Sequence, residues 1–110
     1  MASDRRLIEP GERSPNVVGG WLIGVLLEVA DASRPVRHYY AIGHEDRAKA
    51  EWIAVDHAAR EGHVASSPSQ GMEPVAALRG LTLPTMAMQG LASGEVRALG
   101  WKSPRRWLTP

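Results

Sequence analysis

The chain has 110 residues, of which 44% are hydrophobic and 23% charged, so it has the size and composition of one globular domain. It contains no cysteine, which excludes disulfide bonds, thiolate metal sites and a cysteine nucleophile. The net charge is +1, but the last ten residues hold three basic side chains and no acidic one. The rest of the chain is slightly acidic, so any binding to nucleic acid or to an anionic membrane would have to use this tail.

Residues 1–16 are charged, contain two prolines and show neither a helical nor a strand period, which predicts a flexible leader. The apolar run that follows, residues 17–27, is shorter than the about 20 residues needed to cross a membrane. Acidic residues in the leader cancel the positive charge that a secretion signal requires. These features predict a cytoplasmic protein without membrane association.

A β-hairpin is predicted next along the chain. Every second residue from 21 to 29 is large and apolar, as expected for one face of a strand: Trp21, Ile23, Val25, Leu27 and Val29. Residues 31–35 (Asp-Ala-Ser-Arg-Pro) have the chemistry of a turn. Residues 36–43 then resume strand-forming side chains, so the two segments are expected to pair.

The five-residue turn predicts a register in which Leu26 faces Tyr40 and Glu28 faces His38. A register one residue away would place Glu28 opposite Arg37 instead. The Glu28 and His38 pair would make this part of the sheet sensitive to pH near neutrality. The simpler interpretation is a solvent-exposed salt bridge at the loop end of the hairpin.

Residues 45–61 are predicted to form a helix, because Glu45 and Asp46 give it an acidic first turn and Gly62 offers a left-handed stop. Helical spacing gathers an apolar stripe that we expect to cover the sheet: Ala48, Trp52, Val55 and Ala59. The opposite face, expected to meet solvent, holds Ala50, Ala54, His57 and Glu61.

The C-terminal half is predicted to be mostly helical. Residues 63–65 favour a short third strand, and the spacing of apolar residues after Pro74 favours short helical pieces, one with Thr82 as N-cap and Pro84 in its first turn. A further helix is expected over residues 95–99, ended by Gly100. The predicted fold is therefore a single α+β domain over residues 17–100, a ββα unit with small C-terminal helices, followed by a basic aromatic tail over residues 101–110.

No catalytic motif is found. The chain has no G-x-S-x-G elbow, phosphate loop or dinucleotide-binding turn, and it resembles small bacterial proteins only in its size and its Ala- and Arg-rich composition. His44 and Glu45 begin the zinc-protease pattern H-E-x-x-H, but Ala48 stands where the second histidine is required. The residues closest to a metal constellation, His57, Glu61 and His63, are expected at the solvent face or beyond the helix end. The sequence thus predicts a protein that binds no metal or cofactor and has no enzymatic activity. An enzyme with His57, Glu61 and His63 as its site is the least favoured of three functional hypotheses.

Two surfaces are candidates for binding. One is an apolar patch on the second face of the hairpin, which a single helix cannot cover; it consists of Leu22, Leu26, Tyr40 and Ile42. The other is the tail, which combines stacking surfaces and positive charge in Trp101, Lys102, Arg105, Arg106 and Trp107. The C-terminal helices are an alternative cover for the patch. The tail tryptophans are expected to pack on the domain, so that removal of residues 101–110 lowers stability. If removal leaves stability unchanged but abolishes binding of nucleic acid, the tail is a binding element instead.

The function predicted first is a non-enzymatic cytoplasmic interaction module that forms a homodimer through its sheet, or docks on another protein. Two strands are too few to stand alone, so a third strand from the chain or from a second copy is expected. The alternative is a nucleic-acid or anion-binding accessory protein that uses the tail. The salt dependence of binding distinguishes these two hypotheses, because phosphate binding weakens steeply as the salt concentration rises and apolar association does not.

Overall fold

The computed structural model describes residues 17–108, so the leader predicted for residues 1–16 lies outside the described part of the chain. Within residues 17–108 a five-stranded antiparallel sheet combines with three helices, which confirms the α+β class and the hairpin followed by a helix. The elements in chain order are β1 (Val18–Glu28), β2 (Val36–Ile42), α1 (Arg47–Ala58), β3 (His63–Val64), β4 (Val75–Thr82), α2 (Leu83–Gln89), β5 (Val96–Gly100) and α3 (Arg105–Leu108).

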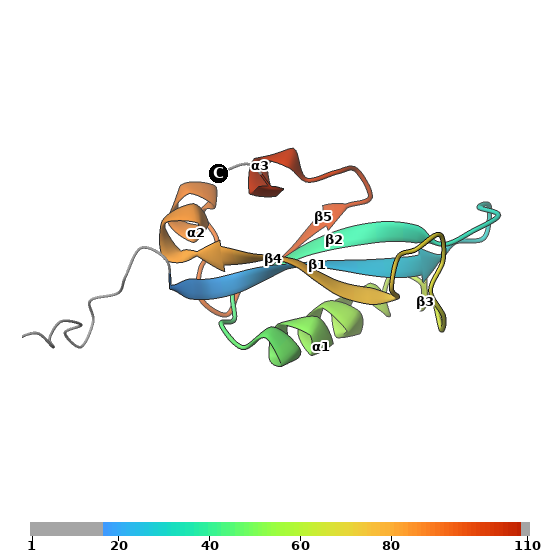
Figure 1. The fold of residues 1–110 in the computed structure, drawn as a ribbon, viewed down its shortest axis with the longest axis horizontal. Helices are drawn as coiled ribbons and strands as arrows, with labels where there is room; N and C mark the ends of the chain where they lie inside the picture. The colour runs from blue at the N-terminus through green and yellow to red at the C-terminus, as the bar shows by residue number, and fades with distance from the viewer. Residues whose placement is uncertain (1–16, 109–110) are drawn as a thin grey trace, which may run out of the picture.

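Strand β1 lies at the centre of the sheet, as Figure 1 shows. On one side it pairs with β2, and β5 pairs with the far side of β2. On its other side β4 pairs with β1 from Val18 to Val25, and the short β3 pairs with Leu27 and Glu28. Strands from the chain itself therefore complete the sheet, and β4 and β5 are its two long outer strands.

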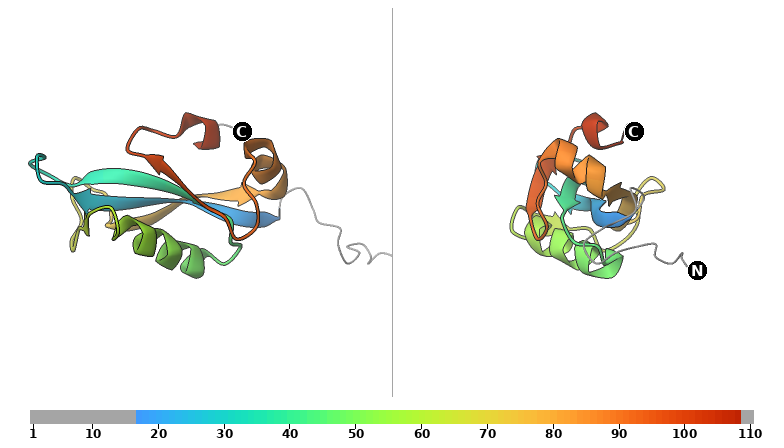
Figure 2. Two further views of the ribbon diagram at one scale, coloured as in Figure 1. Left: turned by 180° about the vertical axis from the view of Figure 1, so that it is seen from behind. Right: turned by 90° about the vertical axis from the view of Figure 1, so that its left-hand side faces the viewer.

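The sheet has helices on both faces. Figures 1 and 2 show α1 on one face and α2 and α3 on the other. The core beneath α1 consists of Ile23, Val25, Leu27, Tyr40, Ile42, Ala50, Ala54 and Ala58. The core on the second face consists of Leu22, Ala41, Leu81, Met86, Leu91 and Trp107. None of the helices within residues 17–108 is long and apolar enough to cross a membrane.

Helix α1 meets the sheet through alanines, not through its tryptophan. Ala50, Ala54 and Ala58 follow one another at a spacing of four residues and are fully buried, whereas Trp52 is 74% exposed. The predicted orientation of this helix is therefore wrong. The sheet face beneath it is already filled by large side chains, among them Tyr40 and Ile23, so only methyl groups fit between the two layers.

The predicted ends of this helix are only partly right. Asp46 is the N-cap, where its carboxylate accepts the backbone N–H of Lys49 at 3.1 Å, so the helix begins at Arg47. It ends at Ala58, and Gly62 does not adopt a left-handed conformation. The backbone N–H of Gly62 donates instead to the carbonyl of Ala58, so the chain leaves the helix through one more turn.

Strands β4 and β5 occupy the segments that were predicted to be helical. In β4 the register shifts between Arg79 and Ala77, which leaves Leu78 as an extra residue in the strand. This bulge allows Leu78 and Leu81 to pack on the same side of the sheet although they are three residues apart. The three-residue spacing that predicts a helical turn is therefore produced here by a β-bulge.

Helix α2 is the C-terminal element that was predicted correctly from local chemistry. Thr82 is its N-cap, with the hydroxyl accepting the backbone N–H of Thr85 at 3.3 Å. Pro84 lies in the first turn, and Gly90 caps the end in the left-handed conformation.

Candidate interaction surface

The register between β1 and β2 differs from the predicted one. Leu26 lies opposite Arg37 and not Tyr40, a shift of three residues. The pairing ends at Leu27 and Val36, so the connection is longer than the five-residue turn predicted. Because the shift is an odd number, every side chain of β2 lies on the opposite face from the one predicted.

This register divides the predicted interface patch between the two faces of the sheet. Its members, Leu22, Leu26, Tyr40 and Ile42, are each no more than 1% exposed. Tyr40 and Ile42 lie beneath α1, and Leu22 packs against the C-terminal half of the chain. The prediction of one exposed apolar patch is therefore wrong, because the protein's own helices cover both faces.

The predicted pair of Glu28 and His38 does not form either. His38 lies opposite Val25, and Glu28 lies opposite His63 of β3. The carboxylate nearest to His38 is that of Glu61, with 3.9 Å between Nδ1 and Oε1. The histidine therefore faces the chain just after α1.

Glu61 also accepts a hydrogen bond from the buried phenol of Tyr40, at 3.0 Å. Burial raises the pKa of the Tyr40 hydroxyl well above its usual value of 10, and the hydrogen bond and negative charge of Glu61 raise it further. The phenol is therefore neutral across the physiological range. It acts as a hydrogen-bond donor that ties β2 to the end of α1.

Tyr40→Phe is expected to lower the free energy of unfolding by about 1 kcal/mol at neutral pH, because Glu61 loses its donor. A raised pKa in the folded state gives stability that is present below about pH 10 and lost as the pH rises further. The difference between wild type and variant should then narrow above pH 10 in urea denaturation. A difference that stays constant up to pH 11 would show that the folded protein does not hold this phenol neutral.

The residues considered for a metal site do not come together. Glu61 faces Tyr40 and His38, and His63 lies in β3 opposite Glu28. Within the described part of the chain, no group of three His, Asp or Glu side chains is placed to hold a metal ion.

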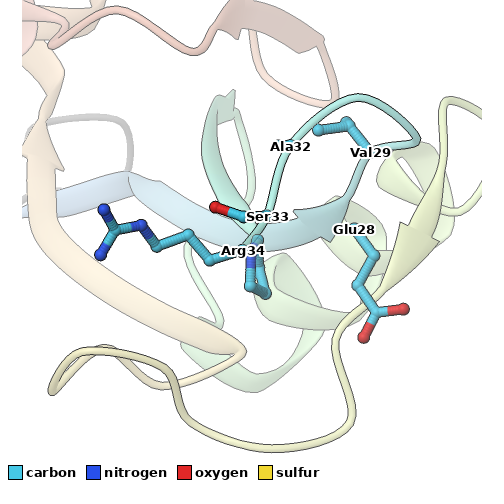
Figure 3. Close-up of a pocket in the computed structure, with 6 residues that line it drawn as sticks. Glu28, Val29, Ala32, Ser33 and Arg34 are labelled. Carbon is cyan, nitrogen blue, oxygen red and sulfur yellow. The ribbon is translucent and has the colours of Figure 1, made fainter.

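A hollow of about 310 Å³ lies beneath the loop that joins β1 and β2 (Figure 3). Glu28 and Arg34 both line it, but Figure 3 shows their charged ends pointing away from each other. Charged groups that converge on one point are what a polar ligand requires. This arrangement lacks them, so the hollow is not a candidate binding site.

The outward side of α1 carries the charged residues Lys49 and Asp56 as well as Trp52, and it borders a larger hollow. Trp52 projects from it, and the hollow of about 420 Å³ is lined by Ala48, Glu51, Trp52, Val55 and Val75. We call it the α1–β4 groove, because Val75 begins β4. Its one charged lining residue, Glu51, accepts a hydrogen bond from Arg47 on the helix at 3.2 Å. This surface is not predicted from the sequence, because the apolar stripe of the helix places Trp52 toward the sheet.

Strand β4 lies beside the groove and is an outer strand. Its eight residues pair with β1 on one side, and no other strand within residues 17–108 pairs with its second side. Proteins usually protect such an edge with prolines, lysines or bulges. Apart from the bulge at Leu78 and a single charged residue, Arg79, strand β4 carries none of these. The guanidinium of Arg79 donates to the carbonyl of Leu108, toward the C-terminal tail.

The tail divides into a packed part and an exposed part. Trp107 is 5% exposed and belongs to the core of the second face. Trp101 is 61% exposed, and the ammonium of Lys102 lies 5.7 Å from its ring centre. Arg105 and Arg106 are exposed as well. Packing of the tail was thus predicted correctly for one tryptophan and not for the other.

Arg97 holds the packed part in place. Its guanidinium lies 6.0 Å from the ring centre of Trp107, and it donates to the carbonyl of Gln89 at 2.7 Å and to Glu95 at 2.6 Å. The backbone N–H of Ala92 and the guanidinium of Arg97 hold the pKa of Glu95 below its usual value. Glu95 therefore carries its charge at neutral pH and orients Arg97 against the tail.

No protein-family model, curated protein sequence or solved structure matches this chain. The structure shows an α+β domain with an apolar groove beside β4 and a basic aromatic tail that packs on the face of the sheet opposite α1.

Proposed function

We propose that this chain is a non-enzymatic interaction module that self-associates, with β4 and the outward side of α1 as the contact between two copies. The main support is Trp52, which is 74% exposed next to an apolar groove and a strand edge. Exposed aromatic side chains beside apolar hollows are enriched at protein interfaces. The absence of cysteine suits a reducing compartment, so we place this activity in the cytoplasm.

A second copy is the partner that suits this surface best. The edge of β4 needs an extended segment of similar length, and a twofold axis brings the same strand of another molecule antiparallel to it. That axis places both α1 helices side by side on one face of a continuous sheet. Trp52 of each molecule then lies against the α1–β4 groove of the other, so each copy supplies both a projecting side chain and the groove that receives one.

The size of the contact indicates a weak dimer. The eight residues of β4 span about 26 Å at about 3.3 Å each. Across the sheet and one helix layer, about 20 Å deep, such a contact buries roughly 500 Å² on each copy. The total of roughly 1,000 Å² is near the lower limit for a specific interface. We therefore expect association at micromolar concentrations.

The groove holds one charged lining residue, so the association should depend little on salt. Trp52→Ser is expected to weaken the dimer about thirtyfold, the usual cost of losing an aromatic residue at the centre of an interface. Sedimentation velocity between about 1 and 100 µM measures this directly, at low and at high salt.

Trp101→Ser is the matched control, because it removes an exposed tryptophan from the other face of the molecule. It should leave the dimer unchanged. A wild-type protein that sediments as a monomer up to 100 µM would overturn the proposal, and so would equal effects of the two substitutions.

A further inference from the structure

The C-terminal part of the chain forms a second surface, which is basic. Residues 101–108 contain three basic side chains and no acidic one. A hollow of about 340 Å³ lies here, and its lining includes Leu99 of β5, Lys102, Arg106 and Trp107. No carboxylate lines it. Its size is at the lower end of pockets that hold small organic groups.

An exposed aromatic ring stands next to these charges. Trp101 is 61% exposed, although Trp107, six residues later, is buried in the core. Lys102 both lines the hollow and lies over the ring of Trp101. A flat apolar face and a cation are thus held next to each other at the surface.

The surface is fixed in place before any ligand arrives. Trp107 anchors it to the core, its backbone N–H donates to the carbonyl of Pro104 at 2.9 Å, and Gln89 of α2 donates to the carbonyl of Arg106 at 3.0 Å. Pro104 itself is buried. A preformed surface loses little conformational entropy on binding, so a small number of contacts is enough.

We infer that this surface binds single-stranded nucleic acid, with a base stacked on Trp101 and the neighbouring phosphates next to Lys102 and Arg106. The four bases all have an aromatic face, so such stacking tolerates any sequence. In a duplex the bases are already stacked on one another, which leaves only the weaker contacts to phosphate. The site lies on the face opposite α1, as Figure 1 shows, so it does not depend on the proposed dimer.

The charges set the expected salt dependence. Contact of Lys102 and Arg106 with two phosphates gives a slope of about −1.4 in a plot of log affinity against log salt concentration for a single-stranded nucleic acid. Lys102→Gln and Arg106→Gln should each make that slope shallower by about 0.7, because each removes one phosphate contact.

The test is fluorescence anisotropy of a labelled thymidine oligonucleotide of about 15 residues, titrated with the full chain at low salt. Trp101→Ala should weaken binding about tenfold, since it removes the stacking face but leaves every positive charge. Its melting temperature should match that of the wild type, because the ring is exposed. Trp52→Ala, on the α1 face, should bind as the wild type does.

Two results would overturn the inference. One is the absence of binding to the oligonucleotide at low salt. The other is binding that Trp101→Ala leaves unchanged and that a duplex or inorganic polyphosphate matches, since the surface would then act only as a cluster of positive charges.

Discussion

Trp107→Ala is expected to lower the free energy of unfolding by about 3 to 5 kcal/mol, although the residue lies close to the C-terminus of the chain. Its side chain is 5% exposed and packs in the same core as Leu22 and Leu81. Removal of the indole leaves a cavity that the sheet on one side and α2 on the other cannot close. It also takes away the ring next to which Arg97 lies.

Urea denaturation of the two tail variants measures this difference. Trp101→Ala removes the same side chain from an exposed position, and we expect it to change the free energy of unfolding by less than about 0.5 kcal/mol. Similar losses in the two variants would mean that Trp107 is not part of the core. The comparison also shows why loss of the whole tail should destabilise the domain.

The parts of the fold that depend on local chemistry could be predicted from the sequence. Thr82, Pro84 and Gly90 each act on a backbone group within a few residues, so α2 follows from its own segment. The hairpin follows from alternation within β1 and β2. The register between β1 and β2 cannot be predicted in this way, because it is set by the length of the connecting loop, which no local rule determines.

Strand β4 shows the limit of periodicity. Within residues 17–108 it pairs only with β1, about sixty residues earlier in the chain, and the bulge at Leu78 interrupts the alternation that reveals a strand. The predicted interface failed for a related reason. It depended on a register and on the assumption that the C-terminal half leaves one face of the sheet free, and both are properties of the whole fold.

The two proposed surfaces use opposite outer strands of one sheet. Strand β4 offers an apolar edge, and β5 leads into the basic tail. A dimer joined through β4 carries two basic surfaces, one on each copy. A single-stranded nucleic acid long enough to reach both basic surfaces would bind the dimer more tightly than it binds one surface alone, because the second contact is intramolecular. Loss of the dimer in Trp52→Ser should then weaken binding of oligonucleotides much longer than about 15 residues and leave binding of the 15-residue oligonucleotide unchanged.

Ala54→Leu is expected to lower the free energy of unfolding by about 2 to 3 kcal/mol, because the added carbons have no space between α1 and the sheet. Ala54 is fully buried beside Ile23 and Tyr40. The helix must move outward to admit leucine, and that movement strains the hydrogen bond between Tyr40 and Glu61 at its end. Alanine and leucine have similar helix propensities, so urea denaturation reports packing and not helix formation.

Ala48→Leu is the matched control, because it makes the same change on the outward side of the same helix, where Ala48 is exposed. It should alter stability by less than about 0.5 kcal/mol when measured at low protein concentration. Comparison of Ala54→Leu with Ala48→Leu also tests which face of α1 packs on the sheet. If Trp52 faced the core, as the spacing of the apolar stripe suggests, Ala48→Leu would be the costly substitution and Ala54→Leu the neutral one.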